Sequence, residues 1–340
     1  SLYEVTYEEH GTIRSFLPTA TGVPEKVEKQ LVMEMTESVY PEKPLVPFIK
    51  ATQDRVVLEI MRGCIRGCRF CQAGMIYRPV REKNVEHLKE LAYKMLKSTG
   101  HEEISLSSLS SSDYRSLEEL VTFLIDTFHG KGVNVSLPSL RVGSIDDDIM
   151  RRLAGIRRTG ATLAPEAGSQ RLRDIINKGV TEEGLMLHVR KLFEHGWQQV
   201  KLYFMIGLPG ETQEDIEAIV DLCRKARDAA GRGMPRLQVT AAISPFVPKS
   251  HTPFQWEPQI TLEQVRERVQ YLRDAFRAEK CLKLRWHEPE MSFLEGVLSR
   301  ADRRIADVVE KAYRRGAIFA SWMDHFSIDP WLESLAECGL

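Results

Sequence analysis

The chain has 340 residues, a formal net charge of −1 and 43% hydrophobic residues. This length allows one large domain or two, and the balanced charge gives no gross attraction to a membrane surface and no strong nucleic-acid signal. No apolar stretch approaches the length of a membrane span, and no signal peptide is visible. Six cysteines in so long a chain do not make a secreted disulfide framework, so we expect a reducing, cytoplasmic location.

Residues 1–50 are expected to form an N-terminal extension and linker. Residues 1–17 alternate apolar and polar side chains about a turn at Gly11, which is typical of a β-hairpin. Residues 24–37 have a weakly helical pattern, and three prolines between residues 41 and 47 indicate an extended linker. The chain begins at serine rather than methionine, so we expect it to be part of a longer protein.

From residue 54 onward, short apolar strands alternate with amphipathic helices, which is the signature of a parallel sheet with crossover helices. The predicted fold is α/β, a (βα)6 partial TIM barrel over residues 51–280, followed by a helical C-terminal region over 281–340. The expected strands are 55–61, 103–109, 133–140, 160–165, 198–206 and 236–244. The expected helices are 84–98, 116–129, 146–157, 169–177, 182–195, 213–229 and 261–279. Capping boxes at Thr212–Asp215 and Thr261–Gln264 mark the starts of the last two helices.

Cys64, Cys68 and Cys71 stand within eight residues, directly after the first expected strand. Thiolate is a soft ligand that selects iron–sulfur clusters, zinc or copper(I). A closed structural zinc site needs four protein ligands and a cubane cluster has four irons, so three thiolates leave one metal position open. The alternatives are three cysteines in a solvated loop, or a Cys₃His zinc site completed by His87 or His101.

The spacing resembles the C-x3-C-x2-C loop of the radical S-adenosylmethionine (SAM) enzymes. In that superfamily the three thiolates hold a [4Fe–4S] cluster, and the fourth iron binds the amino and carboxylate groups of SAM. One electron from the cluster cleaves SAM to methionine and a 5′-deoxyadenosyl radical. The resemblance therefore implies Cys64, Cys68 and Cys71 as metal ligands, and an electron donor such as flavodoxin or ferredoxin. Glycines in the loop would let the backbone approach a bulky cofactor; they are Gly63, Gly67 and Gly74.

In barrels of this type the reactive groups lie at the carboxyl ends of the strands. After the second strand, Ser108, Ser110 and Asp113 stand where the superfamily carries a glycine-glycine-glutamate motif that binds the amino group of SAM. The serines are a departure from that motif, although their hydroxyls can still accept from an ammonium. The alternative is a serine-rich turn that caps the next helix at Ser116.

The third strand is predicted to turn one face toward the barrel interior. Strand alternation puts five residues on that face: Val133, Val135, Leu137, Ser139 and Arg141. Ser139 and Arg141 resemble the serine and arginine of the methylthiotransferase-like branch, and Arg141 would hold the SAM carboxylate with two hydrogen bonds. A salt bridge at the strand end is the alternative for Arg141.

The fourth and fifth strands end in further candidates for SAM binding. Glu166 directly follows an apolar strand, where its carboxylate could bind ribose hydroxyls or an ammonium. Arg173 or Lys178 is a candidate to meet a carboxylate, although a solvated face is the favoured interpretation for both. Gly207 and Gly210 resemble the superfamily segment whose backbone lies along the adenine. 

Three longer segments resemble the uncharacterised B12-binding-domain radical SAM proteins: residues 71–81, residues 245–256 and the tail from Trp322. In that group a cobalamin-binding domain usually precedes the barrel. No doubly wound domain stands ahead of residue 54, so cobalamin is expected to enter through a domain absent from this chain.

The residue that meets the substrate is not identified by the sequence. The candidates are Cys281, Cys338 and His251, with ordinary structural roles as the alternative. No second cluster motif accompanies the remaining cysteines, which argues against a methylthiotransferase.

The expected function is reductive cleavage of SAM for a cobalamin-dependent methyl transfer, or a related modification, of an unknown substrate. The first alternative is a non-methylating modification, thiolation or rearrangement, of tRNA or a ribosomal protein. The second alternative is a metal-stabilised binding module without catalysis.

Overall fold

The computed structural model divides the chain into two compact units. One is Ser1–Met33 together with Val297–Leu340, and the other is Glu34–Gly296. The structure describes residues 2–9, 11–36, 38–49, 51–136, 142, 147, 150–152, 160–229, 231 and 237–340. The expected division of the chain at residues 50 and 280 stays a prediction.

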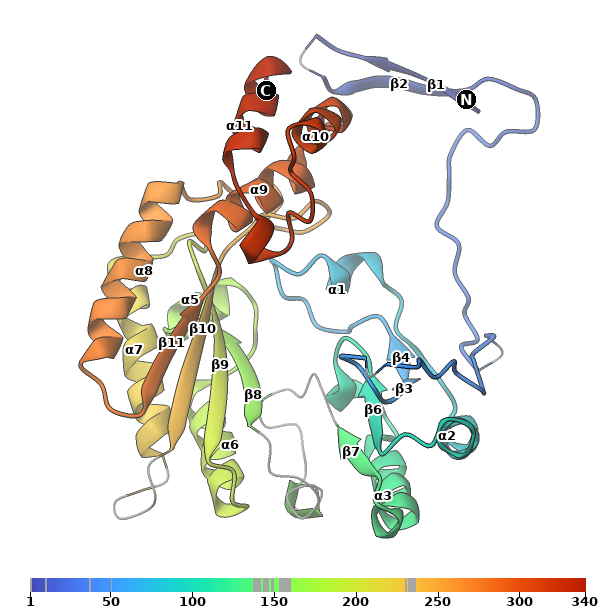
Figure 1. The fold of residues 1–340 in the computed structure, drawn as a ribbon, viewed down its shortest axis with the longest axis vertical. Helices are drawn as coiled ribbons and strands as arrows, with labels where there is room; N and C mark the ends of the chain where they lie inside the picture. Colours follow the sequence, from blue (N-terminus) through green and yellow to red (C-terminus); the bar gives the residue numbers. More distant parts are fainter. Residues whose placement is uncertain are drawn as a thin grey trace. The chain divides into compact units, whose positions relative to one another are not determined.

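The larger unit is built on two parallel sheets (Figure 1). The first contains β3 (Val56–Glu59), β6 (Glu103–Ser107) and β7 (Asn134–Ser136). The second contains β8 (Ala161–Glu166), β9 (Gln199–Ile206), β10 (Gln238–Pro245) and β11 (Leu282–Trp286). Within each sheet the strands follow one another in chain order, and every neighbouring pair is parallel. This is the partial TIM barrel that the sequence predicts, with β11 added where a helical region was expected.

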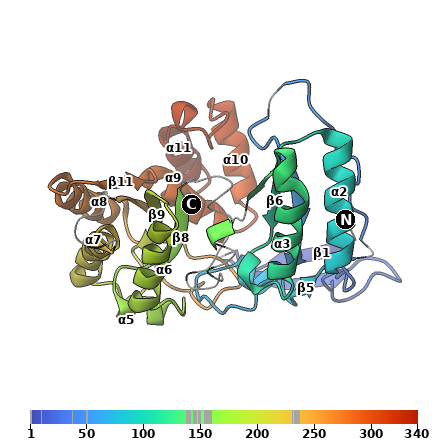
Figure 2. The same cartoon turned by 90° about the horizontal axis from the view of Figure 1, so that it is seen from below.

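Helices cover one face of each sheet. They are α2 (Val85–Thr99), α3 (Leu117–Phe128), α6 (Glu182–Glu194), α7 (Gln213–Asp228) and α8 (Leu262–Arg277). A further short helix, α5 (Gln170–Ile175), follows β8 directly. α2 and α3 pack on the first sheet, and α7 and α8 pack on the second (Figures 1 and 2). Both predicted capping boxes are present, at the starts of α7 and α8. They satisfy backbone N–H groups that a helix start otherwise leaves without partners.

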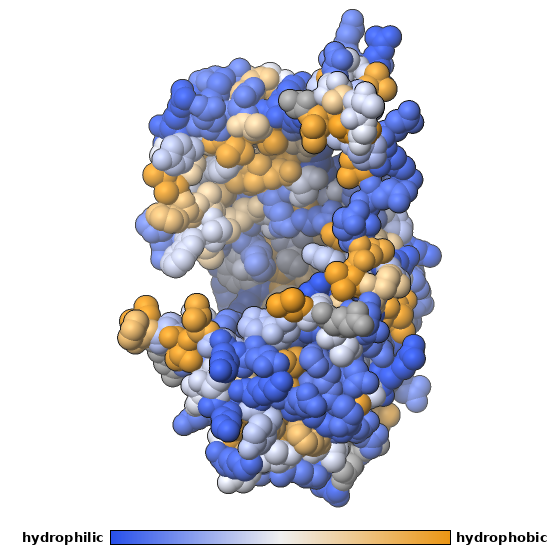
Figure 3. Space-filling view, turned by 90° about the vertical axis from the view of Figure 1, so that its right-hand side faces the viewer, coloured by the Kyte–Doolittle hydropathy of each residue, from blue (hydrophilic) through white to orange (hydrophobic). Residues whose placement is uncertain are grey.

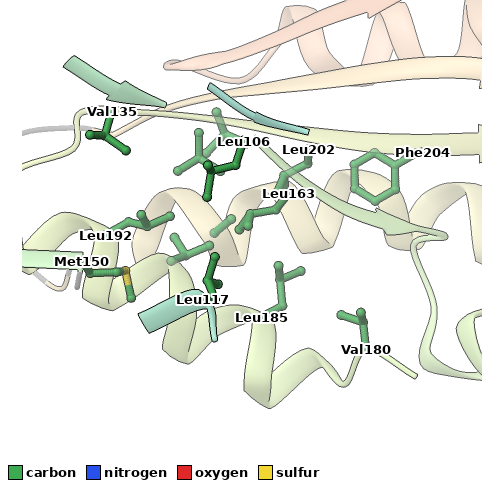
Figure 4. Close-up of a cluster of buried hydrophobic side chains, with 14 of the residues drawn as sticks. Leu106, Leu117, Val135, Met150, Leu163, Val180, Leu185, Leu192, Leu202 and Phe204 are labelled. Atoms are coloured by element: carbon green, nitrogen blue, oxygen red, sulfur yellow. The ribbon is translucent and has the colours of Figure 1, made fainter. Parts of the chain in front are cut away.

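The main hydrophobic core lies between the strands and these helices (Figure 4). Leu106, Leu163 and Leu202 of the strands are buried with Leu185 and Leu192 of α6. Large apolar side chains on this face remove the most nonpolar surface from water, and that removal is the main driving force of folding.

Val133 and Val135 were predicted to face the barrel interior, and this was wrong. Both are buried in the helix-side core, and Val135 pairs with Ile104 on the same face of the sheet. Val133 and Val135 do lie on one face, as the alternation predicts, but so short a strand does not show which of its two faces the helices cover. The rest of that predicted face, Leu137, Ser139 and Arg141, lies outside the described residues.

The smaller unit contains the predicted N-terminal hairpin. β1 (Tyr3–Tyr7) pairs antiparallel with β2 (Ile13–Pro18), and the rings of Tyr3 and Phe16 stack with centroids 4.3 Å apart. α10 (Ile305–Arg314) and α11 (Asp329–Glu337) pack together in the same unit. α9 (Pro289–Arg300) runs across the boundary between the two units.

The weak helix predicted over residues 24–37 is absent from the described part of that segment, residues 24–36. Val27, Val32 and Met33 are all at least half exposed, whereas Met35 is fully buried, so packing covers too little of one face to support a helix. A short helix is marginal in water unless tertiary packing buries one of its faces. 

The predicted linker carries several apolar side chains that remain at the surface. Val39, Leu45 and Phe48 are almost fully exposed in a segment without regular secondary structure. Figure 3 shows hydrophobic residues exposed among hydrophilic ones on the face it displays. Within the described parts of the chain, none of the helices combines the length and hydropathy that crossing a bilayer requires.

Candidate active site

The three cysteines lie on a loop that is closed at its base by a short antiparallel pair. β4 (Met61–Arg62) pairs with β5 (Arg81–Glu82), and α1 (Ala73–Ile76) is the one short helix that the structure shows between them. Because this loop follows β3, it lies at the carboxyl edge of the first sheet. The residues between β4 and β5 are called the cysteine loop below.

Two loop glycines serve the loop itself. Gly63 has a φ of +88°, and a Cβ there would stand 2.7 Å from the carbonyl oxygen of Tyr77. Any larger residue would therefore force the base of the loop apart. A Cβ on Gly67 would stand 2.9 Å from Nδ2 of Asn177, which donates to the Gly67 carbonyl at 2.8 Å. From the sequence, these glycines were expected only to let the backbone approach a cofactor.

The thiols of Cys64, Cys68 and Cys71 form no disulfide, and all three residues are half-buried. Backbone N–H groups point at two of them: Arg66 N lies 3.4 Å from Cys64 Sγ, and Gly74 N lies 3.3 Å from Cys71 Sγ. Donors of this kind favour the charged thiolate, which is the form that binds metal.

No three His, Cys, Asp or Glu side chains in the described parts of the chain converge closely enough to hold one metal ion. A cubane does not need such convergence, because its cysteines are ligands of a cluster with several irons. His101, one of the two histidines proposed for a zinc site, lies 3.5 Å from Asp54 before β3. That position is at the amino edge of the sheet, opposite the cysteine loop.

An ion pair with a buried carboxylate fixes one side of the cysteine loop. The guanidinium of Arg66 donates to both carboxylate oxygens of Asp113, with Nε 3.0 Å from Oδ2. The Asp113 side chain is only 5% exposed, and its hydrogen bonds raise the pKa of Arg66. Asp113 was predicted to bind SAM, and in this structure its carboxylate holds the loop.

The other side of the loop is held by backbone hydrogen bonds and a small apolar core. Arg69 N donates to the Ile176 carbonyl at 3.0 Å, and Phe254 N donates to the Arg69 carbonyl at 3.2 Å. Gln72 Nε2 donates to the Ser250 carbonyl at 3.1 Å. Between these contacts the ring of Phe70 packs on a second buried cluster, which is formed by Ala167, Leu172, Ile176, Leu208, Phe246 and Phe254.

The serine-rich turn after β6 satisfies much of its own hydrogen bonding. The hydroxyls of Ser108 and Ser111 are 3.0 Å apart, and Ser110 is buried with its carbonyl accepting from Asp113 N at 3.0 Å. Ser116 occupies the N-cap position of α3, but its side chain makes no capping hydrogen bond. Of the two predicted serine contacts, Ser108 is the half-buried one and Ser110 the buried one.

Glu166 ends β8 in a left-handed conformation, with a φ of 70°. The pairing of β8 with β9 is irregular between Leu163 and Glu166, as at a bulge that re-aims a side chain. Lys178 Nζ lies 3.0 Å from the Glu166 carboxylate and 5.9 Å from the ring centroid of Phe70. Burial raises the pKa of Glu166, and Lys178 opposes that rise. Backbone strain of this kind is common at functional sites.

The interpretation of Arg173 and Lys178 as residues of a solvated face was wrong. Arg173 is fully buried and donates to the carbonyls of Ala167, Gly168 and Val180. The sequence did not indicate the burial of Arg173, because no periodic pattern predicts that a guanidinium will donate hydrogen bonds to the carbonyls of a turn.

The glycine turn after β9 is held by a buried acid that the sequence analysis did not single out. Gly207 and Gly210 have φ angles of +79° and +74°, and a Cβ on Gly207 would lie 2.6 Å from Ile260. Gly207 N donates to Glu211 Oε1 at 2.7 Å, and Arg268 lies 3.2 Å from the same oxygen. Burial raises the pKa of Glu211 to about 7. The sequence signal that could have identified Glu211 is an acidic residue placed directly after a glycine turn.

The three predicted substrate-facing candidates are dispersed. His251 is exposed, and the neighbouring residues 250 and 254 contact the cysteine loop. Cys281 precedes β11 at the amino edge of the second sheet, where its carbonyl accepts from Val239 N. Cys338 follows α11 in the smaller unit. Cys223 is fully buried in α7, and burial raises its pKa.

The sequence profile of the Radical SAM superfamily matches residues 58–223. An uncharacterised protein of Methanocaldococcus jannaschii is 30% identical over 321 residues, covering 92% of this chain and 69% of the relative. This chain belongs to the radical SAM superfamily. It is an enzyme whose family uses SAM and a [4Fe–4S] cluster. The three thiols, the N–H donors to two of them and the adjacent Arg66 cation fit a negatively charged cluster.

Other relatives cover less. The tRNA-2-methylthio-N(6)-dimethylallyladenosine synthase of Desulforamulus reducens is 25% identical, over 54% of this chain and 41% of that protein. The structure of Streptococcus suis SuiB bound to SAM has a TM-score of 0.49 and 13% identity, covering 71% of this chain and 52% of that one. The chain thus spans about two thirds of the M. jannaschii protein and about half or less of these two.

Replacing Asp113 by asparagine should weaken the hold on the cysteine loop. The side chain keeps its shape but loses the charge that pairs with Arg66, so we expect a loss of about 1–3 kcal/mol in the free energy of unfolding. Iron and sulfide bound per chain after anaerobic reconstitution should fall in parallel. 

The matched control is Glu119→Gln, which removes the charge of an exposed partner of Lys89. If Asp113→Asn keeps full iron and stability but loses SAM affinity, the carboxylate binds SAM as the sequence predicted and does not fix the loop.

Glu211 should make stability depend on pH. Its folded pKa of about 7 lies above the ordinary 4.5, so the folded state holds the proton more tightly. That contribution is complete below pH 4.5 and is lost as the pH rises through 7. Relative to Glu211→Gln, the wild type should therefore lose up to about 3 kcal/mol between pH 4.5 and 8. Urea unfolding across this range measures it, with Glu263→Gln on α8 as the exposed control. Parallel profiles for wild type and Glu211→Gln would contradict the assignment.

Proposed function

We propose that this chain is the catalytic barrel of an enzyme that reductively cleaves SAM at a [4Fe–4S] cluster held by Cys64, Cys68 and Cys71. The observation that carries the proposal is the set of three half-buried thiols, none in a disulfide, on one clamped loop in a radical SAM chain. When bound, the cluster supplies the electron that cleaves SAM to methionine and a 5′-deoxyadenosyl radical. A flavodoxin or ferredoxin is the proposed electron donor.

The residues around the cysteine loop prepare that site. Arg66 places a cation beside Cys64 and Cys68, where it offsets the charge of the thiolates. The ring of Phe70 and its apolar neighbours exclude water from one side of the loop. A low-dielectric surrounding strengthens the electrostatic contacts within it.

The SAM contacts proposed from the sequence divide between side chains and backbone. Ser108 and Ser110 accept from the amino group, with Ser139 and Arg141 toward the carboxylate. Glu166 binds the ribose hydroxyls, and its pairing with Lys178 holds the carboxylate in place and opposes the rise in its pKa that burial causes. Gly207 and Gly210 lay their backbone along the adenine, and the bond from Gly207 N to Glu211 fixes that turn.

For the reaction that follows, we propose cobalamin-dependent methyl transfer, with cobalamin supplied by a domain outside this chain. The support is the resemblance to the B12-binding-domain group and a relative named an uncharacterised methyltransferase of Pyrococcus horikoshii. That relative is 23% identical, over 65% of this chain and 46% of its own length.

Thiolation is the second candidate, because several relatives are named methylthiotransferases. The other cysteines of this chain favour it less. Cys223 is buried in α7, Cys281 precedes β11 and Cys338 follows α11, so they stand on three separate elements. They form no second cluster motif in the sequence.

Cysteine replacement tests the cleavage step. Anaerobic reconstitution with iron and sulfide, then reduction with SAM present, should give a cubane EPR signal and 5′-deoxyadenosine. Cys64→Ala, Cys68→Ala or Cys71→Ala should abolish both, because each removes one of only three cluster ligands. The control is Cys223→Ala, which removes a buried thiol and should keep the iron. If the wild-type protein gives neither the EPR signal nor 5′-deoxyadenosine, the proposal is wrong.

The methyl-transfer step has its own readout. A methyl group taken from SAM leaves S-adenosylhomocysteine, whereas reductive cleavage leaves methionine. The full-length protein incubated with cobalamin, reductant and SAM should therefore form S-adenosylhomocysteine together with 5′-deoxyadenosine. Methionine and 5′-deoxyadenosine as the sole products would favour a non-methylating reaction.

A further inference from the structure

The face of the second sheet that the helices leave uncovered carries a group of basic residues. On β9, Val200, Leu202 and Phe204 are buried on the helix side. Successive side chains of a strand point to opposite faces, so Lys201 and Tyr203 lie on the uncovered face. By the same alternation, Lys283 and Arg285 of β11 lie there too, since Leu282 is buried with the core.

Strand register brings these residues together. Lys201 pairs with Thr240, and Thr240 pairs with Lys283, so the two lysines share one row across β9, β10 and β11. Tyr203, Ala242 and Arg285 form the next row in the same way. Neighbouring strands lie about 5 Å apart, and residues two apart on a strand rise about 7 Å. Three cations therefore stand within roughly 10–12 Å of one another.

These cations have no carboxylate partner among the described residues. Lys201 Nζ donates to the hydroxyl of Tyr203 at 3.0 Å, and Lys283 and Arg285 are exposed. The cations on the helices are paired differently: Arg224, Lys225 and Arg266 each form an ion pair with a carboxylate.

The acidic residues of the uncovered faces do not offset this charge. Alternation places Glu59, Glu103 and Glu166 on or at the ends of these faces, and each already pairs with its own cation. The second sheet thus presents three positive charges toward the interior of the barrel, beside a half-exposed tyrosine ring.

We propose that these two rows bind an anionic group, a phosphate or a carboxylate, of a small-molecule substrate. The proposal rests on the proposed function and adds the class of substrate to it. Arg285 offers a planar donor pair that matches either group, and the two lysines add point charges. Tyr203 supplies apolar surface beside them.

The position of the two rows on the sheet distinguishes the proposed binding site for the substrate anion from the site of the SAM carboxylate. Met205 and Ser244 form the row nearest the carboxyl edge on β9 and β10. The Tyr203 row lies about 7 Å below it and the Lys201 row about 13 Å below it. The anion is therefore held toward the amino ends of the strands, while the reacting carbon lies at the edge beside the cysteine loop. The substrate should carry its charge roughly 10 Å from the carbon that reacts.

Isothermal titration calorimetry with inorganic pyrophosphate and, separately, succinate tests this site. Lys283→Gln with Arg285→Gln should weaken binding of the recognised anion at least about tenfold, because two charge-assisted contacts are lost. Lys201→Gln is the second variant, in case the double variant folds poorly. The control, Lys225→Gln with Arg277→Gln, removes the same charge from the outer helices α7 and α8.

Binding of one anion that the double variant or Lys201→Gln weakens, and the control does not, supports the proposal and identifies phosphate or carboxylate. Absence of binding to wild type, or equal weakening in the control, overturns it. The measurement uses neither SAM nor reductant, so its failure is distinct from failure of the cleavage reaction.

Discussion

The placement of the cysteine loop is the constraint on which the rest of this site depends. The loop has no extended secondary structure of its own between β4 and β5, so its shape comes from its neighbours. Asp113 holds one side through Arg66. Phe70 anchors the other side by packing against the small core that includes Phe246 and Phe254. A thiol set can bind a cluster only when its members are held together, because ordering a free loop costs conformational entropy at every residue.

The carboxyl edge of the barrel concentrates buried charge. Glu166 and Glu211 both end or follow strands, both are mostly buried, and burial raises the pKa of each. Each is met by one cation, Glu166 by Lys178 and Glu211 by Arg268, and Glu211 also fixes the glycine turn through Gly207 N. Unpaired, such groups would be strongly destabilising, so their retention at this edge fits a site that needs fixed charges more than it needs stability.

Prediction from sequence succeeded where the signal is local and failed where it is not. The strands of the barrel, the hairpin and both capping boxes depend on periodicity and on side chains three residues apart. The side of β7 that meets the helices and the burial of Arg173 depend on residues far along the chain. β11 was missed although Leu282, Leu284 and Trp286 alternate with Lys283 and Arg285, because a five-residue alternation after the sixth predicted strand is a short signal.

The sequence by itself determined the family, the metal ligands to propose and the order of strands and helices. These follow from a cysteine spacing and from repeating patterns that no tertiary contact has to supply. Only the tertiary structure decided what clamps the cysteine loop, which acid holds the glycine turn, and that Lys201, Lys283 and Arg285 share neighbouring rows. The physical reason is that parallel strands join residues separated by whole helices, so charges distant in sequence become neighbours only through the register of the sheet.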